Sequence, residues 1–535
     1  MPPNNNSIQS ISQSIYLGDV TEEELKKIVS DMSSKHSTGL DDVSNYLIKK
    51  TIMEISVPLL YVINLSLEKG TFPTKLKECV VSPIFKKDDK AQVNNYRPIT
   101  LTSCISKIFE KAFLSRIINF LEKHKFLDSN QFGYQKGKST TDAVKRAVTH
   151  IVKAFNEKNC IMGIFIDLSK AFDCVNIPIL CDILDKIGIR GKAGEWILSY
   201  LKGRKQCVKL NVVENNVCSC EYSDFREVMY GVPQGSILGP FLFLIYVNII
   251  PILIKNNYSN CIPFVYVDDT SLIITGGDEE ILEKDANLII NDTVQSLSSL
   301  NLITNTSKTV VVPISLVDKK VQYKVMIEGE LIEQVEDVKF LGINFDSHLT
   351  WKKHINEICN KVNRGNFLLT QLKQTVSASV LIQVYYANVY SHLVYGINVW
   401  GTANKELMTK LLKCQKRSVR ILDNLRYRDS CVESFKKMKL LTVPAIFVYF
   451  SILDIRRTEE GERFQDVHSY NTRNKTDFVL EKFRGAFAKK SPMFTEKRLY
   501  NMLPRSIKDI KSYNQFKCTL KEHLIMKCPY SVDEF

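Results

Sequence analysis

Apolar and polar residues alternate along this chain in blocks that predict both strands and helices. Short, β-branched apolar runs, at 161–166 and 264–267, are typical of buried strands. Amphipathic spacing over 21–30 and 106–121 predicts helices, and Thr21 followed three residues later by Glu24 predicts a capping box. Beyond residue 355 the pattern is mainly helical and basic. The chain is therefore expected to be an α/β (α+β) protein with a helical C-terminal part.

Two of the predicted strands end in acidic residues. Phe264-Val-Tyr-Val-Asp-Asp-Thr270 runs into a further apolar stretch, which predicts strand, tight turn and strand with Asp268 and Asp269 at the tip. The upstream strand ends at Asp167, where a helical pattern begins. Asp-Asp is ordinary turn chemistry, but crowded carboxylates repel one another unless a cation neutralises them. Two acid-ending strands side by side predict a site for two Mg²⁺ ions, with Mn²⁺ as the alternative.

Three motifs in order resemble those of the reverse transcriptases of non-LTR (LINE-type) retrotransposons, of the jockey, X-element or CR1-like kind. Phe165–Asp173 resembles motif A, Gly231–Pro240 resembles motif B and Tyr266–Asp269 resembles motif C. An ordered series is far more specific than any one of its members. The resemblance implies a right-hand polymerase, with fingers and a palm built on an antiparallel sheet, followed by an α-helical thumb and a C-terminal tail.

The resemblance also implies an activity, RNA-directed DNA synthesis. Two metal ions would assist nucleotidyl transfer from dNTPs to a primer 3′-hydroxyl on an RNA template. Asp167 and Asp268 are the expected metal ligands and Asp269 a supporting one. Lys308, in a string similar to motif D, would protonate or neutralise the departing pyrophosphate. Phe172 would face the sugar 2′ carbon and exclude ribonucleotides.

Further residues are expected to touch the substrates. Arg97 lies in a Tyr-Arg-Pro-Ile segment similar to one in the fingers of the family, where a guanidinium can pair with the triphosphate. Gln234 and Gly235 would seat template and nucleotide, because their loop has few bulky side chains. Lys136 and Lys138, expected to be exposed, would contact the template backbone.

Nucleic-acid contacts are also predicted towards the C-terminus. Phe340–Ile355 resembles the primer grip and its passage into the thumb, which gives Gly342 and Trp351 such contacts. His348 and His354 in the same string lack further ligands and are expected to be structural rather than metal-binding. Strings similar to the tails of jockey-like elements are expected to bind RNA or target DNA; they are Tyr470–Asn474 and Tyr500–Pro504.

Composition indicates which class of partner the protein binds and where in the cell it is expected. With 72 Lys plus Arg against 58 Asp plus Glu, the formal charge of +14 favours a polyanionic partner. We find no apolar run long enough to span a bilayer and no signal peptide, so the protein is expected to be intracellular, in the nucleus and/or cytoplasm, without a membrane partner. Most of the 14 cysteines stand singly, as small buried hydrophobes do in a reducing compartment.

No endonuclease pattern accompanies the motifs. The sequence is therefore expected to be a fragment of a longer element protein, the product of a decaying copy, or a polymerase whose nicking activity is supplied elsewhere or has been lost. Two other classes stay open. A decayed or domesticated relative would bind RNA without chemistry, although three intact acids argue against long decay. An RNA-dependent RNA polymerase is disfavoured by Phe172 and by the string around Trp351. The predicted parts are an N-terminal extension with the entry motif (1–50), fingers (51–150), palm (151–345), thumb (346–430) and a basic helical tail (431–535).

Overall fold

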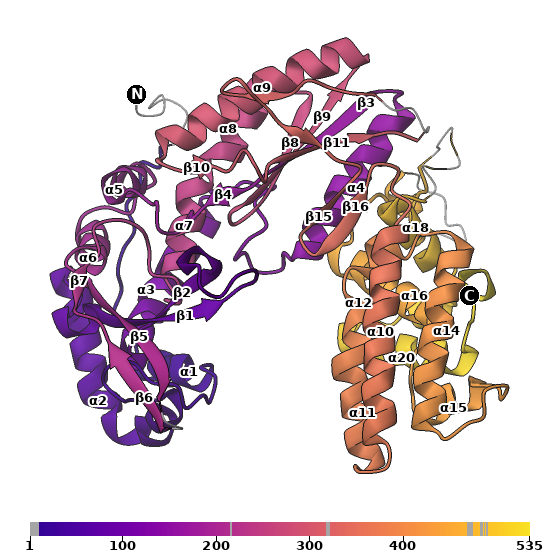
Figure 1. The fold of residues 1–535 in the computed structure, drawn as a ribbon, viewed down its shortest axis with the longest axis horizontal. Coiled ribbons are helices and arrows are strands. Elements are labelled where there is room, and N and C mark those ends of the chain that lie inside the picture. The colour runs from indigo at the N-terminus through magenta and orange to yellow at the C-terminus, as the bar shows by residue number, and fades with distance from the viewer. Residues whose placement is uncertain are drawn as a thin grey trace.

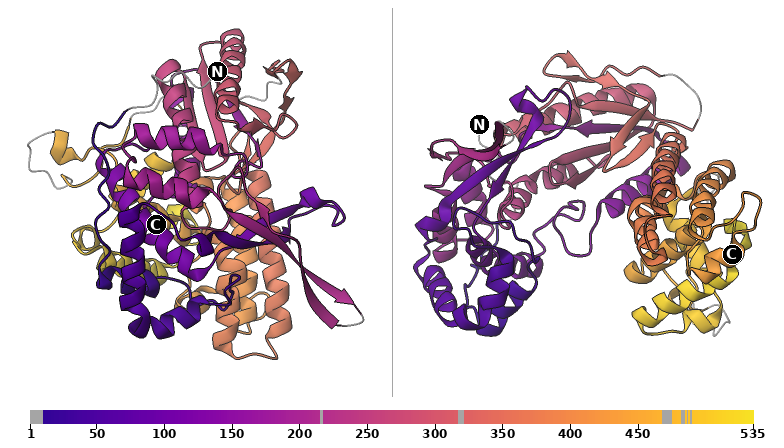
Figure 2. Two further views of the ribbon diagram at one scale, coloured as in Figure 1. Left: turned by 90° about the vertical axis from the view of Figure 1, so that its left-hand side faces the viewer. Right: turned by 60° about the horizontal axis from the view of Figure 1, so that its bottom comes forward.

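Three groups of elements follow one another around an arch in the computed structural model (Figure 1). The N-terminal elements form one leg, a five-stranded sheet with its helices forms the top, and the C-terminal helices form the other leg. Figure 2 shows from two further directions that both legs descend from the sheet. The structure describes residues 10–214, 217–316, 321–467, 475–481, 485, 487 and 490–535.

The first leg combines helices with a smaller sheet. Strand β1 pairs antiparallel with β2 and parallel with β5, and β5 continues into a hairpin with β6. The helices meet in an aromatic core, where Phe113 stacks on Trp196 with ring centroids 4.1 Å apart. Its main elements are α1 (Glu22–Ser30), α2 (Asn45–Lys69), β1 (Glu78–Phe85), β2 (Tyr96–Leu101), α3 (Cys104–Lys123), α5 (Ile177–Lys186), α6 (Lys192–Leu201), β5 (Lys205–Glu214), β6 (Val217–Tyr222) and β7 (Arg226–Glu227).

The central sheet has the strand order β14-β11-β3-β9-β8, and its two faces are covered by different helices. Successive side chains of a strand point to opposite faces. Leu272 accordingly packs in one core with α9, and Ile273 packs in the other with α4. The elements are α4 (Thr140–Asn156), β3 (Cys160–Ile166), α7 (Gly239–Val247), α8 (Ile249–Asn257), β8 (Cys261–Tyr266), β9 (Asp269–Gly276), α9 (Glu279–Ser299), β11 (Val310–Ile314) and β14 (Glu333–Gln334).

The second leg begins after a β-hairpin and is helical. Its principal elements are β15 (Asp337–Phe340), β16 (Ile343–Asp346), α10 (Lys352–Leu372), α11 (Ala378–Tyr385), α14 (Lys405–Leu422), α15 (Val432–Lys437), α16 (Val443–Thr458), α18 (Pro492–Asn501) and α20 (Tyr513–Lys527). The short strands and α-helices are β4 (Leu168–Ser169), β10 (Ile303–Thr304), β12 (Met326–Ile327), β13 (Glu330–Leu331), α12 (Ser391–Val394), α13 (Ile397–Trp400), α17 (Phe464–Val467) and α19 (Arg505–Lys508). A π-helical turn, Tyr386–Tyr390, joins α11 to α12, and short 3₁₀ turns in the described chain are Thr74–Lys77, Val93–Asn95 and Val532–Glu534.

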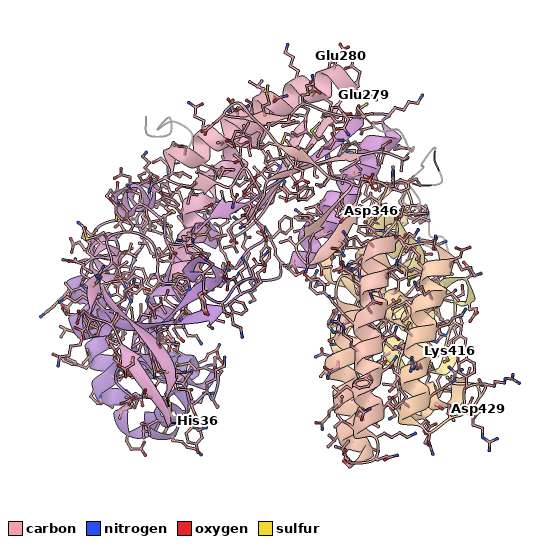
Figure 3. All side chains as sticks on the ribbon, viewed as in Figure 1. His36, Glu279, Glu280, Asp346, Lys416 and Asp429 are labelled. Carbon is pink, nitrogen blue, oxygen red and sulfur yellow. The ribbon has the colours of Figure 1, made fainter. Side chains whose placement is uncertain are left out.

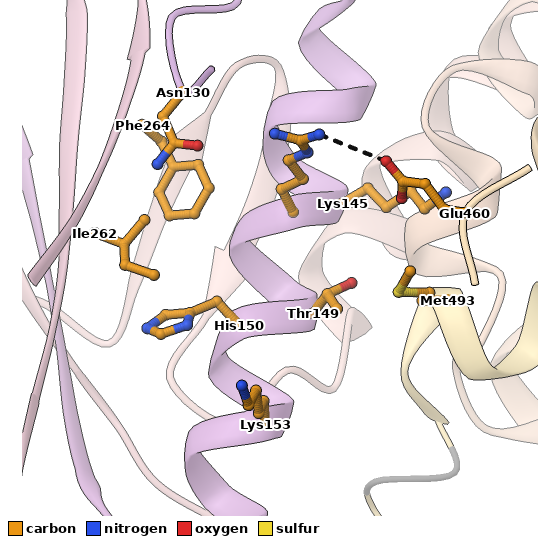
Figure 4. A pocket seen from close by; sticks show the side chains of 10 residues that line it. Asn130, Lys145, Thr149, His150, Lys153, Ile262, Phe264, Glu460 and Met493 are labelled. Carbon is orange, nitrogen blue, oxygen red and sulfur yellow. Dashed lines mark hydrogen bonds and ion pairs between the residues drawn. The ribbon is translucent and has the colours of Figure 1, made fainter. Parts of the chain in front are cut away.

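Buried ion pairs join the second leg to the sheet. The ammonium of Lys145, on α4, lies 2.6 Å from carboxylate oxygens of both Asp454 on α16 and Glu496 on α18. Figure 4 shows Lys145 beside a pocket of about 290 Å³, where Arg146 also pairs with Glu460 at 3.5 Å. Removing one partner of such a buried cluster would leave an uncompensated charge, at a cost of about 3–5 kcal/mol. The cluster therefore fixes the C-terminal helices against α4.

Several sequence expectations are confirmed and two are corrected. Strands β8 and β9 form the predicted strand, turn and strand, and α1 begins after Thr21, whose side chain accepts a hydrogen bond from Glu24 N. The Glu24 carboxylate pairs with Arg116 at 2.9 Å, so the structure shows the Thr21 half of the predicted capping box. No helix begins at Asp167; a two-residue strand and a turn intervene, and α5 begins only after Asn176 caps it. The domain boundaries stay predictions.

The expectation about apolar runs was wrong. Among the described residues, two helical segments are long and apolar enough to cross a membrane by length and composition alone, Asn45–Lys69 and Gly239–Asn257. The second is 72% buried inside the protein, as a core helix is, whereas the first is 22% buried. The length of these segments is weak evidence of a membrane, and the intracellular location stays a prediction.

Candidate active site

Three acidic residues meet at one edge of the central sheet. Tyr266 pairs with Asp269 across a two-residue turn, which leaves Asp268 at the tip of the β8–β9 hairpin. Strand β3 pairs with β9 up to Ile166, so Asp167 directly follows the strand that lies beside Asp269. The two predicted acid-bearing strand ends are thus neighbours in the sheet, as the sequence indicated.

A segment far upstream supports the hairpin turn. Phe132 N donates to Val265 O at 2.8 Å, which lays this segment along β8. A Cβ on Gly133 would lie 2.6 Å from Cγ2 of Val267 and 3.0 Å from its backbone nitrogen. Val267 itself has a φ of +62°, which is strained for a β-branched residue. Gly133 therefore permits a close approach that holds the turn, a role that the sequence pattern did not reveal.

Burial and mutual repulsion raise the pKa values of two of the acids. Burial, with added repulsion from Asp268 and Asp167, raises the pKa of Asp269 to about 6. Burial and Asp167 also raise the pKa of Asp268, against the opposing effect of Arg97 and Lys86. Both carboxylates still reach solvent at the tip, but the surrounding protein limits their hydration. A bound cation would relieve this repulsion.

The donor chemistry fits Mg²⁺, although the acids do not form a complete cage. Within the described residues, no three Asp, Glu, His or Cys side chains are grouped closely enough to hold a metal ion by themselves. Mg²⁺ keeps several waters and is usually held by one or two carboxylates together with substrate phosphates. Asp167 and Asp268 can supply these carboxylates, so the arrangement suits an ion that binds together with a nucleotide.

Lys308 lies beside the first acid. Its ammonium is 3.7 Å from Asp167 Oδ2, and the side chain is 61% exposed. Strand β10 pairs with β4, and Asn305 N donates to Asp167 O at 2.8 Å, so backbone contacts set this position. An exposed pair of this kind adds at most about 1 kcal/mol to stability, which leaves the ammonium free to act on a ligand.

The motif B loop joins the motif A turn to strand β2. Gln234 Nε2 donates to Asp173 Oδ1 at 3.1 Å, and Gln234 O accepts a hydrogen bond from Thr100 N at 2.7 Å. Gly235 has a φ of +126°, and a Cβ there would lie 2.4 Å from Thr100 O. Phe172 is partly buried and stacks on Phe243 at 4.6 Å. The two predicted residues of this loop therefore sit where the first leg meets the sheet.

A buried carboxylate that the sequence analysis missed holds the other end of this loop. Glu110, on α3, is fully buried, and its Oε2 accepts hydrogen bonds from Ile237 N at 2.7 Å and Leu238 N at 3.0 Å. Its Oε1 accepts from Ser106 Oγ at 2.9 Å. These amides precede α7, so the carboxylate satisfies donors that the helix start leaves unpaired and lies at its positive end. In the sequence, the one signal of this burial was the position of Glu110 within a predicted amphipathic helix.

Two cations of the first leg face the acids. Arg97 lies on β2, opposite Ile84 of β1, and Lys86 directly follows β1. Both side chains are exposed, and both oppose the rise in the pKa of Asp268 that burial causes. The predicted triphosphate residue is therefore close to the acidic edge, and Lys86 accompanies it.

Two predicted nucleic-acid contacts differ from expectation. Lys136 is exposed, but the ammonium of Lys138 donates to the carbonyls of Ser129 and Gln131 at 2.9 and 2.8 Å, and burial lowers its pKa to about 8. Trp351 is 2% exposed and packs edge-on against Phe345. Both side chains serve the local structure, because their polar or aromatic groups are already engaged by the protein.

The remaining predicted residues lie near the second leg. Gly342 is at the tip of the β15–β16 hairpin with a φ of +84°, next to Tyr395. His354 is buried, and its Nδ1 accepts a hydrogen bond from Asn344 N, in keeping with a structural histidine. Tyr500 is buried at the end of α18, whereas Tyr470–Asn474 lies outside the described residues.

Comparisons with known proteins agree with this geometry. Residues 84–345 match the family model described as reverse transcriptase (RNA-dependent DNA polymerase). A probable RNA-directed DNA polymerase from transposon BS of Drosophila melanogaster is 27% identical, over 81% of this chain and 48% of the relative. Those of the X-element and of jockey in the same organism are 26% and 25% identical, each over 78% of this chain and 46% of the relative. The chain thus spans about half the length of the curated relatives that it matches.

A solved structure of apo telomerase from Candida tropicalis, truncated from the C-terminal domain, is also similar, with a TM-score of 0.35 and 15% identity over 51% of this chain and 54% of that one. The α/β polymerase fold class predicted from the sequence is confirmed by the family match together with the element order. Residues 84–345 thus match the reverse transcriptase family, and the chain is similar over most of its length to the RNA-directed DNA polymerases of LINE-type, non-LTR retrotransposons.

Proposed function

We propose that this chain catalyses RNA-directed DNA synthesis, adding dNTPs to a primer 3′-hydroxyl on an RNA template. The observation that carries the proposal is the meeting of Asp167, Asp268 and Asp269 at one sheet edge, with cations on both sides. An acidic centre flanked by cations suits a reaction in which negative charge moves from a triphosphate to a leaving pyrophosphate.

The position of each side chain suggests its role in the reaction. Asp167 and Asp268, supported by Asp269, would hold two Mg²⁺ ions, which when bound supply activation of the 3′-hydroxyl and neutralisation of the pyrophosphate. Arg97 and Lys86 would receive the triphosphate oxygens from the side of the first leg. Lys308 is exposed beside Asp167 and is free to give a proton to the leaving group.

Substrate choice would depend on Phe172. Its ring stacks on Phe243, which fixes it where the motif A turn meets the motif B loop. A rigid ring beside the sugar would exclude a 2′-hydroxyl and so favour dNTPs over ribonucleotides.

The test is primer extension on poly(rA)/oligo(dT) with dTTP and Mg²⁺. Asp167→Ala and Asp268→Ala should each abolish extension while salt-sensitive RNA binding is retained. Asp533→Ala, at an exposed aspartate near the C-terminus, is the matched control and should extend normally. Retained synthesis in either active-site variant would overturn the ligand assignment.

The same assay addresses the binding-protein alternative. A wild-type chain that binds RNA but extends no primer, with either Mg²⁺ or Mn²⁺, would favour a relative that has kept the acids without the chemistry. Efficient extension with ribonucleotides instead of dNTPs would favour an RNA polymerase.

A further inference from the structure

A tyrosine on the second leg is almost fully exposed. The loop between α14 and α15 contains Arg426, Tyr427 and Arg428, and the Tyr427 side chain is 88% exposed. Tyrosine usually packs at least one ring face against the protein, because the ring is a large apolar surface. An aromatic ring held in solvent between two arginines is a feature that stability does not explain.

Hydrogen bonds give this loop a defined shape. Arg426 N donates to Asp429 Oδ2 at 2.8 Å, and Asp429 N donates to Arg426 O at 3.2 Å. Arg420, in the last turn of α14, donates from Nη2 to Asp429 O at 3.2 Å. These hydrogen bonds close the turn and connect it to α14. Tyr427 therefore projects into solvent from an ordered loop.

Positive charge surrounds the ring. The Arg420 guanidinium lies 5.8 Å from the Tyr427 ring centroid, within the range of a cation–π contact. Two acids lie in this loop: Asp423 is paired with Lys437 at 2.9 Å, and Asp429 accepts the hydrogen bond from Arg426 N. Residues 413–428 contain six basic side chains: Lys413, Lys416, Arg417, Arg420, Arg426 and Arg428.

This surface is separate from the acidic edge of the sheet. In Figure 3, Lys416 and Asp429 lie on α14 and on the α14–α15 loop, at the side of the second leg that faces away from the first leg. Helices α10 and α11 lie between this side and the inside of the arch in Figure 1. A strand held at Tyr427 would therefore not occupy the place of the growing duplex.

We propose that Tyr427, with Arg420, Arg426 and Arg428, forms a second nucleic-acid-binding site that takes a single-stranded segment. An unpaired base would stack on the exposed ring, and the guanidinium groups would bind the phosphates on either side. A duplex hides the faces of its bases, so this site would discriminate against it. An apolar protein partner is a poorer match, because cations and not apolar side chains flank the ring.

The test separates this site from the active site. The full chain is first saturated with an unlabelled, non-extendable template–primer hairpin, and fluorescein-labelled 20-nucleotide single strands of RNA and of DNA are then titrated by anisotropy. Tyr427→Ala should weaken binding of the single-stranded probe by roughly 5- to 150-fold, the range for loss of one base–aromatic stack. Tyr427→Phe keeps the ring and should bind as wild type does.

Further variants serve as a control for the tyrosine and test the arginines separately. Tyr16→Ala removes an equally exposed tyrosine, 86% accessible, from the other leg and should change nothing. Arg426→Gln with Arg428→Gln should reduce the slope of log affinity against log salt by about 1.4, as expected for two phosphates of a single strand. Comparison of the RNA and DNA probes identifies which strand is preferred.

The outcomes either support or overturn the proposal. Wild-type affinity in Tyr427→Ala for both probes would overturn it, as would an equal loss of affinity for a labelled duplex. Because Tyr427→Ala leaves the acids intact, extension of a short template–primer should continue, so failure of this site and failure of the polymerase proposal are distinguishable. An unchanged melting temperature would show that the altered loop remains folded.

Discussion

Glu110 offers the sharpest test of how the first leg positions the motif B loop. Its carboxylate is the acceptor for two backbone amides at the start of α7 and for one serine hydroxyl, in a place from which solvent is excluded. Glu110→Ala removes all three acceptor contacts at once. Each unsatisfied buried amide costs about 1–3 kcal/mol, so we expect a loss of about 3–5 kcal/mol in the free energy of unfolding.

Glu110→Gln separates the charge from the hydrogen bonds. The amide oxygen can still accept from Ile237 N and Leu238 N, and its NH₂ group can donate to Ser106 Oγ. Only the charge assistance is lost, which is worth about 1–2 kcal/mol for these bonds. Glu110→Gln should therefore lower the free energy of unfolding by about 1–2 kcal/mol, less than Glu110→Ala does. Glu122→Ala, at an exposed position on the same helix, should stay within about 0.5 kcal/mol of wild type.

The assay combines urea denaturation with steady-state kinetics of dTTP incorporation. A displaced motif B loop should raise the dTTP KM and lower kcat together in Glu110→Ala, by about tenfold or more, whereas Glu110→Gln should stay within a few-fold. Equal destabilisation by both substitutions would refute the hydrogen-bond account. Wild-type kinetics in a folded Glu110→Ala variant would refute the positioning role.

Three further predictions follow from single contacts. Gly133→Ala should lower synthesis at least tenfold, because the new methyl group displaces Val267, whereas Gly277→Ala, which meets no atom within 4 Å, should be harmless; wild-type activity in the first would show that the turn yields freely. Burial lowers the pKa of His354 to about 4, so the unfolded chain binds a proton first as the pH falls. His354 should thus contribute a fall in stability of up to about 3 kcal/mol between pH 6.5 and pH 4, and in urea titrations the decrease should be smaller by that amount in His354→Gln than in wild type. Phe172→Val should admit ribonucleotides in a competition assay, and unchanged discrimination would exclude the gate.

Local patterns in the sequence predicted that acid-bearing strand ends would lie side by side. A strand that is buried on both faces must be apolar along its length, so its end is visible where an acid interrupts the run. This rule identified Asp167, Asp268 and Asp269, and pairing of β3 with β9 confirmed that the two strand ends are neighbours. Helix α1 was likewise visible, because its cap and its amphipathic spacing lie within a few residues of one another.

The sequence pattern did not predict the surroundings of residues whose contacts come from distant parts of the chain. Lys138 and Trp351 look available in the sequence, yet carbonyls and an aromatic core engage them. Glu110 reads as an ordinary polar position on a helix, but its amide partners are 127 and 128 residues away. Spacing along a chain fixes periodicity and therefore which face of an element is apolar.

Periodicity does not determine which side chains of different elements contact one another, because those contacts depend on how helices and strands pack in space. Lys145, which binds carboxylates more than 300 residues downstream, carries no local signal of that contact. The sequence by itself thus determined the strands, the acids at their ends and the order of the motifs. The tertiary structure alone decided which side chains support that site and which, like Tyr427, remain in solvent, because burial is a property of packed surfaces and not of neighbours in sequence.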